Sequence, residues 1–157
     1  MIMRPPLRNL AQRGAAAIEL ALLALPLAGL TFGTSEFGRA LHQYNSLAKT
    51  VRDAARYQST VAAGNTLAGR CLALSGVTTN NGTTCSGTAL LPGLTLAQIS
   101  VCDRISCPGT HNLRPTGRGV VNLVTVTITG HPFTSMVPFA MPSITYGPIS
   151  ATMVQSL

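Results

Sequence analysis

The sequence predicts an α+β protein. A long N-terminal helix crosses a membrane, continues as an amphipathic helix and packs on a small antiparallel sheet of three or four strands, stapled by disulfides. Three patterns carry this prediction: residues 15–33 are apolar, Gly or Pro at nearly every position, residues 35–63 repeat apolar side chains at helical spacing, and residues 119–130 alternate as a half-buried strand does. The expected order is a leader over 1–14, a transmembrane helix over 15–34, the amphipathic helix over 35–63 and an extracytoplasmic α+β domain over 64–157.

The first 14 residues are a short basic leader. Three of the 11 Lys and Arg residues lie there, at Arg4, Arg8 and Arg13. Positive charge before an apolar segment holds that end of the chain in the cytoplasm, so the rest is expected on the far side of the membrane. The other basic residues of this +7 chain are mostly scattered, which argues against nucleic acid as a partner.

The apolar run is about 19 residues long, enough for a helix to cross a bilayer of roughly 30 Å. Pro26 lies in its middle, and proline bends a helix but is tolerated where neighbouring helices pack. A cleavable secretory signal peptide is the alternative, with a weak cleavage candidate around residues 31–33. A signal peptide has no use for Glu19, which is the one ionisable residue of the run.

Glu19 is the fifth residue after Gly14. A carboxylate near lipid is unfavourable, and deeper burial costs on the order of a few kcal/mol, so a compensating charge is expected. If the chain is cut between Gly14 and Ala15, the new α-amine lies one helical turn from Glu19, where opposite charges can meet. That amine can belong to the same chain or to a neighbour in an assembly.

The amphipathic helix over residues 35–63 has no strong breaker between it and the apolar run, so the two are expected to form one continuous helix. Its apolar stripe packs either on the chain's own domain or on partner helices, and the sequence leaves both possibilities open. The stripe consists of Phe37, Leu41, Tyr44, Ala48, Val51 and Ala55.

Beyond Gly64, which interrupts the helix, the chain is expected to form a second short helix and then strands. The second helix is expected over 66–74. Strand patterns occupy residues 94–102, 119–130 and 144–154, and the middle one is the strongest.

Four cysteines lie on the exported side of the chain, where disulfides form and persist. Three pairings are possible, and proximity in the sequence favours Cys71 with Cys85 and Cys102 with Cys107. A zinc site is the alternative, but its spacing is loose and an oxidising compartment disfavours free thiolates. Its ligands would be Cys102, Cys107 and His111, with His131 as a possible fourth.

No catalytic pattern is present in the sequence. Outside the apolar run the acids are Glu36, Asp53 and Asp103, which are too dispersed for a carboxylate pair, and no phosphate-binding loop or nucleophile motif occurs. We therefore expect no enzymatic activity, no cofactor and no metal.

Residues 13–57 resemble the TadE-like family of minor pilins (pseudopilins) of the tight-adherence, Flp-type (type IVb) pilus system. The Val/Thr strand and the last strand are similar in style to that family but far less specific. The residues that carry the resemblance are Arg13-Gly14-Ala15-Ala16-Ala17-Ile18-Glu19, Pro26, Glu36-Phe37-Gly38-Arg39-Ala40-Leu41, Tyr44-Asn45 and Arg52 with Ala54-Ala55-Arg56-Tyr57.

The resemblance implies that a prepilin peptidase cuts after Gly14 and that Glu19 neutralises the α-amine of Ala15 during assembly. It implies a single-pass protein of the bacterial inner membrane, with a cytoplasmic N-terminus and a periplasmic domain, that works with other pilins and the pilus assembly machinery in surface adhesion. Leu20 stands where major pilins pair a Tyr with the Glu, and the attached domain is large, which favours a minor component. The alternatives are an unprocessed single-span protein exposing a small periplasmic ligand-binding or sensory domain, and a secreted binding domain.

Overall fold

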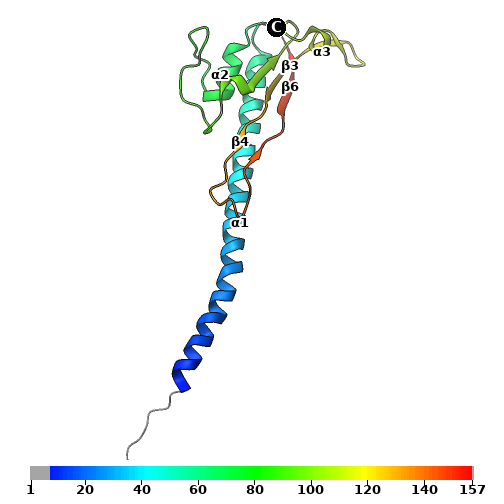
Figure 1. Ribbon diagram of the computed structural model, residues 1–157. Coiled ribbons are helices and arrows are strands. Elements are labelled where there is room, and N and C mark those ends of the chain that lie inside the picture. The colour runs from blue at the N-terminus through cyan, green and yellow to red at the C-terminus, as the bar shows by residue number, and fades with distance from the viewer. Residues whose placement is uncertain (1–7, 157) are drawn as a thin grey trace, which may run out of the picture. The chain divides into compact units, whose positions relative to one another are not determined.

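The computed structural model describes residues 8–156, with their side chains from Gly14 onward. The described chain begins with the long helix α1 (Arg8–Ser59), and the other elements follow it in sequence (Figure 1). Two compact units are present. One holds the described residues up to Arg39 together with Ser135–Pro142, and the other holds Ala40–Thr134 together with the described residues from Ser143 onward.

Helix α1 runs without interruption through Pro26, as the sequence predicts. It ends at Ser59, four residues before the expected end at Ala63. The chain turns there because the N–H of Thr60 bonds to the carbonyl of Tyr57 (3.1 Å) and Gly64 adopts a φ of +91°, a conformation that glycine reaches without strain. This turn leads into α2 (Leu67–Ser75), close to the expected short helix.

The sheet is antiparallel and is built around β3 (Val120–Ile128). Residue Val126 of β3 pairs with Val101 of β1 (Ile99–Cys102) and with Ala151 of β6 (Ile149–Gln155), so β3 lies between these two strands. The short β2 (Arg114–Pro115) pairs with the start of β3. The predicted sheet of three or four strands is therefore confirmed.

Two of the expected strands are shorter than their apolar patterns suggested. Within residues 94–102 the strand begins only at Ile99, because a 3-10 turn, η1 (Leu96–Gln98), precedes it and the side chain of Gln98 caps the N–H of Thr95 (2.9 Å). Pro148 has no N–H for a strand ladder and interrupts residues 144–154. The piece before it, β5 (Ile144–Thr145), pairs with β4 (Pro132–Phe133) in a separate small sheet.

The core lies between β3 and the part of α1 beyond Ala40. On β3, Val124, Val126 and Ile128 are buried and the intervening threonines are not, which confirms the predicted alternation. This half of the apolar stripe therefore packs on the chain's own domain, and each fully buried aliphatic side chain contributes about 1.5–3 kcal/mol. The core contributed by α1 is Leu47, Val51, Ala54 and Ala55.

Disulfides join Cys71 to Cys85 and Cys102 to Cys107, the two pairs that proximity in the sequence favours. The first ties α2 to the polar loop that follows it. The second closes the turn after β1, and α3 (Pro108–His111) begins directly behind it. A small domain with few aromatic residues gains from such links, each typically worth about 2–4 kcal/mol.

Candidate functional site

The first part of α1 is an apolar surface that the other described residues leave largely uncovered. Every side chain from Gly14 to Phe32 is exposed. Among the described residues, α1 is the one helix long and apolar enough to cross a membrane. A helix that is apolar on all sides is stable in lipid or against other helices, and this chain therefore has one candidate transmembrane segment near its N-terminus.

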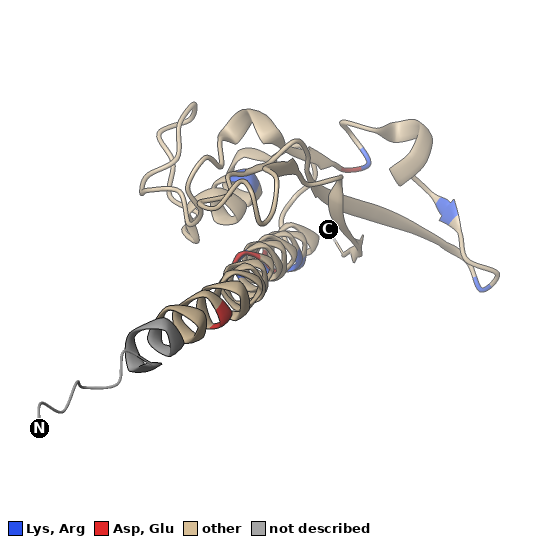
Figure 2. Cartoon of the chain, turned by 60° about the horizontal axis from the view of Figure 1, so that its bottom comes forward, with Lys and Arg blue, Asp and Glu red and all other residues tan. Residues whose placement is uncertain are grey.

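The predicted cleavage and assembly residues lie within this exposed part of α1. Gly14, Ala15 and Glu19 are all helical and exposed, and Ala15 and Glu19 share a helix face because they are four residues apart. Between Gly14 and Ser35, Glu19 is the one charged side chain (Figure 2). The structure therefore presents its carboxylate on the outside of the helix, where a partner group can reach it.

The two hydroxyl groups near the end of the run are satisfied within the helix. Thr31 donates to the carbonyl of Ala28 (2.9 Å), and Thr34 donates to the carbonyl of Leu30 (2.9 Å). Such internal bonds remove unpaired polar donors from a surface that faces lipid or a neighbouring helix. Pro26 is exposed as well, so the other described residues do not pack over this position.

Just beyond the run, Glu36 is buried at 3% exposure and gathers three donors. Arg39 Nη1 donates to Glu36 Oε1 (2.6 Å), and Oε2 accepts from Ser135 Oγ (3.0 Å) and from the N–H of Met136 (3.1 Å). The ion pair with Arg39 spans one helical turn. This carboxylate therefore fixes the segment that begins at Ser135 to the helix.

The other residues of the predicted helix motif have different surroundings. Phe37 and Gly38 are exposed, and a Cβ added at Gly38 would meet nothing within 4 Å. Tyr44 lies against Tyr146, with ring centroids 6.0 Å apart, and the Tyr146 hydroxyl donates to the carbonyl of Ala40 (2.7 Å). The structure thus gives Glu36, Arg39 and Tyr44 internal contacts and leaves Phe37 and Gly38 on the surface.

His131 is a buried residue whose position the sequence did not reveal. Its ring is 1% exposed and stacks on Tyr146 at an interplanar angle of 5°. Among the described residues, neither ring nitrogen has a hydrogen-bond partner. Burial lowers the pKa of His131, because the charged form is poorly solvated there.

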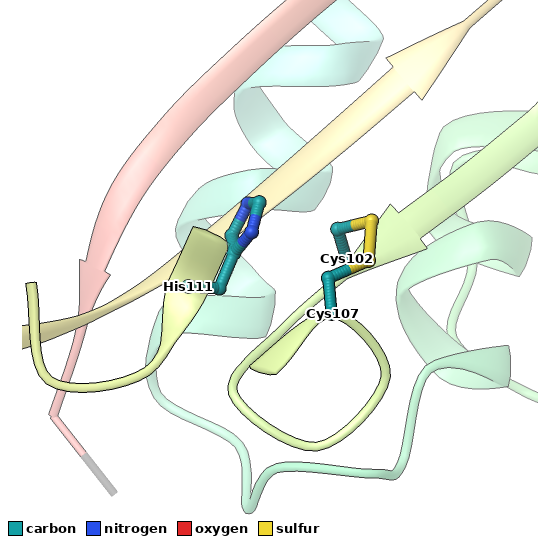
Figure 3. Close-up of side chains that lie close together, drawn as sticks. All are labelled: Cys102, Cys107 and His111. Atoms are coloured by element: carbon teal, nitrogen blue, oxygen red, sulfur yellow. A yellow bond between two sulfur atoms is a disulfide. The ribbon is translucent and has the colours of Figure 1, made fainter. Parts of the chain in front are cut away.

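The proposed zinc ligands lie close together but are not available as a set. Sulfur and nitrogen atoms of Cys102, Cys107 and His111 lie within 4.8 Å of one another, yet the two sulfurs are bonded to each other (Figure 3). Neither cysteine offers a thiolate in this state. His111 contacts the hydroxyl of Thr125 through Nε2 (2.8 Å), and burial lowers its pKa. Among the described residues, the group does not include His131.

Residues 14–56 match the family model described as TadE-like protein. The match begins at the predicted cleavage site and ends three residues before the end of α1. It covers the exposed apolar run, Glu19 and the motif from Glu36 to Tyr44, and it confirms the resemblance over this TadE-like segment. Comparison with curated proteins and with solved structures gave no match.

Proposed function

We propose that this chain is a structural minor pilin (pseudopilin) that takes part in assembling a Flp/Tad-type pilus used in surface adhesion. The TadE-like match indicates a component associated with the Tad pilus. One observation carries the more specific role. The first part of the matched segment, from Gly14 to Phe32, is an exposed apolar helix whose single charge is Glu19, so it calls for both a membrane and neighbouring helices.

The first step of the proposal is cleavage after Gly14 by a prepilin peptidase. The fold does not require glycine there, because a Cβ at Gly14 would meet nothing within 4 Å. Glycine inside a helix costs about 1 kcal/mol relative to Ala, so its presence calls for another reason. Helix α1 begins at Arg8, so the bond after Gly14 must be unwound before it is cut, and glycine eases that change and leaves room at the cut.

The second step is charge pairing at Glu19. After cleavage, the α-amine of Ala15 and the carboxylate of Glu19 lie on the same face of the helix, one turn apart. In lipid the low dielectric strengthens the attraction between opposite charges and penalises an unpaired one. We propose that Glu19 receives the α-amine of a neighbouring subunit, which couples insertion into the assembly to neutralisation of the charge.

The third step is packing between helices. Gly29 and Gly33 are four residues apart on α1, and a Cβ at either position would meet nothing within 4 Å. Small residues at this spacing let two helices approach closely in a membrane. The partners in this proposal are other pilins and the pilus assembly machinery of the bacterial inner membrane, with the domain after α1 on the periplasmic side.

The experiment replaces Glu19 with Gln in cells that assemble the pilus. The variant is expected to insert and to be cut normally, yet to lower piliation at least about tenfold, because an unpaired partner charge is worth more than about 1.4 kcal/mol in lipid. Asp53→Asn is the matched control, since Asp53 is an exposed acid on the same helix outside the apolar run. Undiminished piliation in Glu19→Gln cells would contradict the proposal and favour an unprocessed single-span protein with a periplasmic sensory domain.

A further inference from the structure

We propose that residues 136–142 form a membrane-interface loop whose exposed apolar side chains lie in the lipid interface on the C-terminal side of the span. This proposal needs only that α1 crosses a bilayer, so it does not depend on the pilin function. The molecules that we expect to contact this loop are lipids, at the boundary between headgroups and acyl chains.

The first observation is the composition of this membrane-interface loop. All seven residues are apolar or proline: Met136, Val137, Pro138, Phe139, Ala140, Met141 and Pro142. Met136 is 76% exposed and Phe139 is 80% exposed. Such large side chains are unfavourable in water, and Phe is one of the residues that amphipathic segments bury at a lipid interface.

The second observation is where the loop is attached. Glu36 lies two residues beyond the span over 15–34 and holds the loop through the hydroxyl of Ser135 and the N–H of Met136. Further along, Phe139 packs edge-to-face on Phe32, with ring centroids 6.4 Å apart. A helix rises about 1.5 Å per residue, so Phe32 lies ~6 Å closer to the middle of the span than Glu36 does.

The loop therefore descends by about one helical turn, from the buried carboxylate toward the apolar run. Phe32 belongs to that run, so the surface formed by Phe32 and Phe139 continues the surface that the span presents to lipid. This continuity argues for lipid as the occupant.

The third observation concerns the backbone, because polar groups left unpaired are costly near hydrocarbon. The N–H groups of Met136 and Val137 bond to Glu36 and to Ser135 Oγ (3.1 Å each). Those of Ala140 and Met141 both bond to the carbonyl of Val137 (2.9 and 3.1 Å). The two prolines have no N–H. Four of the five N–H groups of the loop are therefore bonded, which suits a partly dry environment.

The chain contains no tryptophan, so Phe139→Trp introduces a single tryptophan as a fluorescent probe in the loop. The full-length variant is reconstituted at high dilution into phosphatidylethanolamine–phosphatidylglycerol vesicles, with and without lipids brominated near the headgroup end of the acyl chain. We expect blue-shifted emission that brominated lipid quenches several-fold and that acrylamide in the water quenches weakly.

Val120→Trp is the matched control, since Val120 is also exposed, at 60%, but lies on β3 in the other compact unit. Its emission should be red-shifted, quenched by acrylamide and unaffected by brominated lipid. Phe32→Trp marks the lipid-facing reference and should be quenched by brominated lipid. A further variant, Glu36→Ala in the Phe139→Trp background, should lose a large part of the quenching by lipid, because the loop is no longer held near the span.

Equal acrylamide access at positions 139 and 120 would overturn the proposal. Protection from acrylamide without quenching by brominated lipid would also overturn it, because the loop would then be covered by protein. If brominated lipid does not quench the Phe32→Trp probe, α1 does not cross the bilayer as assumed, and the proposal is wrong.

Discussion

The carboxylate of Asp103 is expected to be the most important single polar group for the stability of the domain that follows Ala40. It is fully buried. Oδ2 accepts from the N–H of Gly64 (2.6 Å), and Oδ1 accepts from the N–H groups of Ile105 (2.9 Å) and Ser106 (2.7 Å) and from Ser106 Oγ (2.9 Å). It thus ties the turn after α1 to the loop after β1.

The perturbation is Asp103→Asn, which keeps the shape and changes one acceptor into a donor. The amide oxygen can serve the three donors at Oδ1, so the amide nitrogen must face the N–H of Gly64. Losing a charge-assisted bond and opposing two buried donors costs about 2–3 kcal/mol. For a domain of about 100 residues, each kcal/mol lowers Tm by roughly 4–8 °C, so we expect a fall of about 10 °C or more.

The assay is thermal unfolding of the full-length protein in detergent, followed by the near-UV circular dichroism of its tyrosines. Asp53→Asn is the control, because Asp53 is exposed on α1 and its replacement should change stability by less than about 0.5 kcal/mol. Equal melting temperatures for Asp103→Asn and Asp53→Asn would refute the reasoning.

Acid dependence gives a second readout of Asp103. Burial acts to raise its pKa, but the hydrogen bonds from Ser106, Gly64 and Ile105 outweigh burial and lower it. A lowered pKa in the folded state means that this stabilisation is complete above the unfolded pKa of about 3.9 and is lost as the pH falls below it. The Asp103→Asn variant should lack this part of the acid sensitivity.

Five further changes have defined expectations. His131→Phe should raise the unfolding free energy by about 1 kcal/mol at neutral pH, because it removes two buried nitrogens without partners. It should also flatten the loss of stability below pH ~6.5 that follows from the lowered pKa of His131, and urea unfolding at pH 5 and 7.5 checks both. Replacing Cys71 and Cys85 by Ala should lower the free energy of unfolding by about 3 kcal/mol, and replacing Cys102 and Cys107 should lower it by about 2 kcal/mol, because the first pair closes the longer loop. Urea midpoints in the reverse order would contradict this. Gly64→Ala should cost about 1 kcal/mol or more by thermal melting, because φ there is +91°, whereas Gly38→Ala should not destabilise the isolated chain.

The parts of the fold that the sequence predicted are those with strong local periodicity. Helix α1 and strand β3 could be predicted from their repeats of apolar residues. The ends of β3 lie within two residues of the glycines that flank it in the sequence. The pattern over 94–102 and over 144–154 was less decisive, because one capping side chain at Gln98 and one proline at Pro148 redirect the backbone locally.

In the candidate site, too, the features that depend on local spacing could be predicted and those that depend on folding could not. Gly14 and Glu19 could be proposed from the sequence because the roles expected of them depend only on spacing along one helix. The partners of Glu36 could not, since Ser135 is 99 residues away and the contact is made only by folding. The stacking of His131 on Tyr146 could not be predicted from the sequence either. The uncharged stretch over 136–142 is visible in the sequence, but its attachment to the helix at Glu36 is not.

The maturation that we propose removes the basic leader and exposes an α-amine one turn from Glu19. Intact-mass measurement of the membrane-extracted protein, from cells with and without a prepilin peptidase, tests it most directly. We expect a chain that starts at Ala15 when the peptidase is present and a full-length chain when it is absent or when Gly14 is replaced by Val. Functional protein that retains residues 1–14, or normal processing of Gly14→Val, would contradict the account.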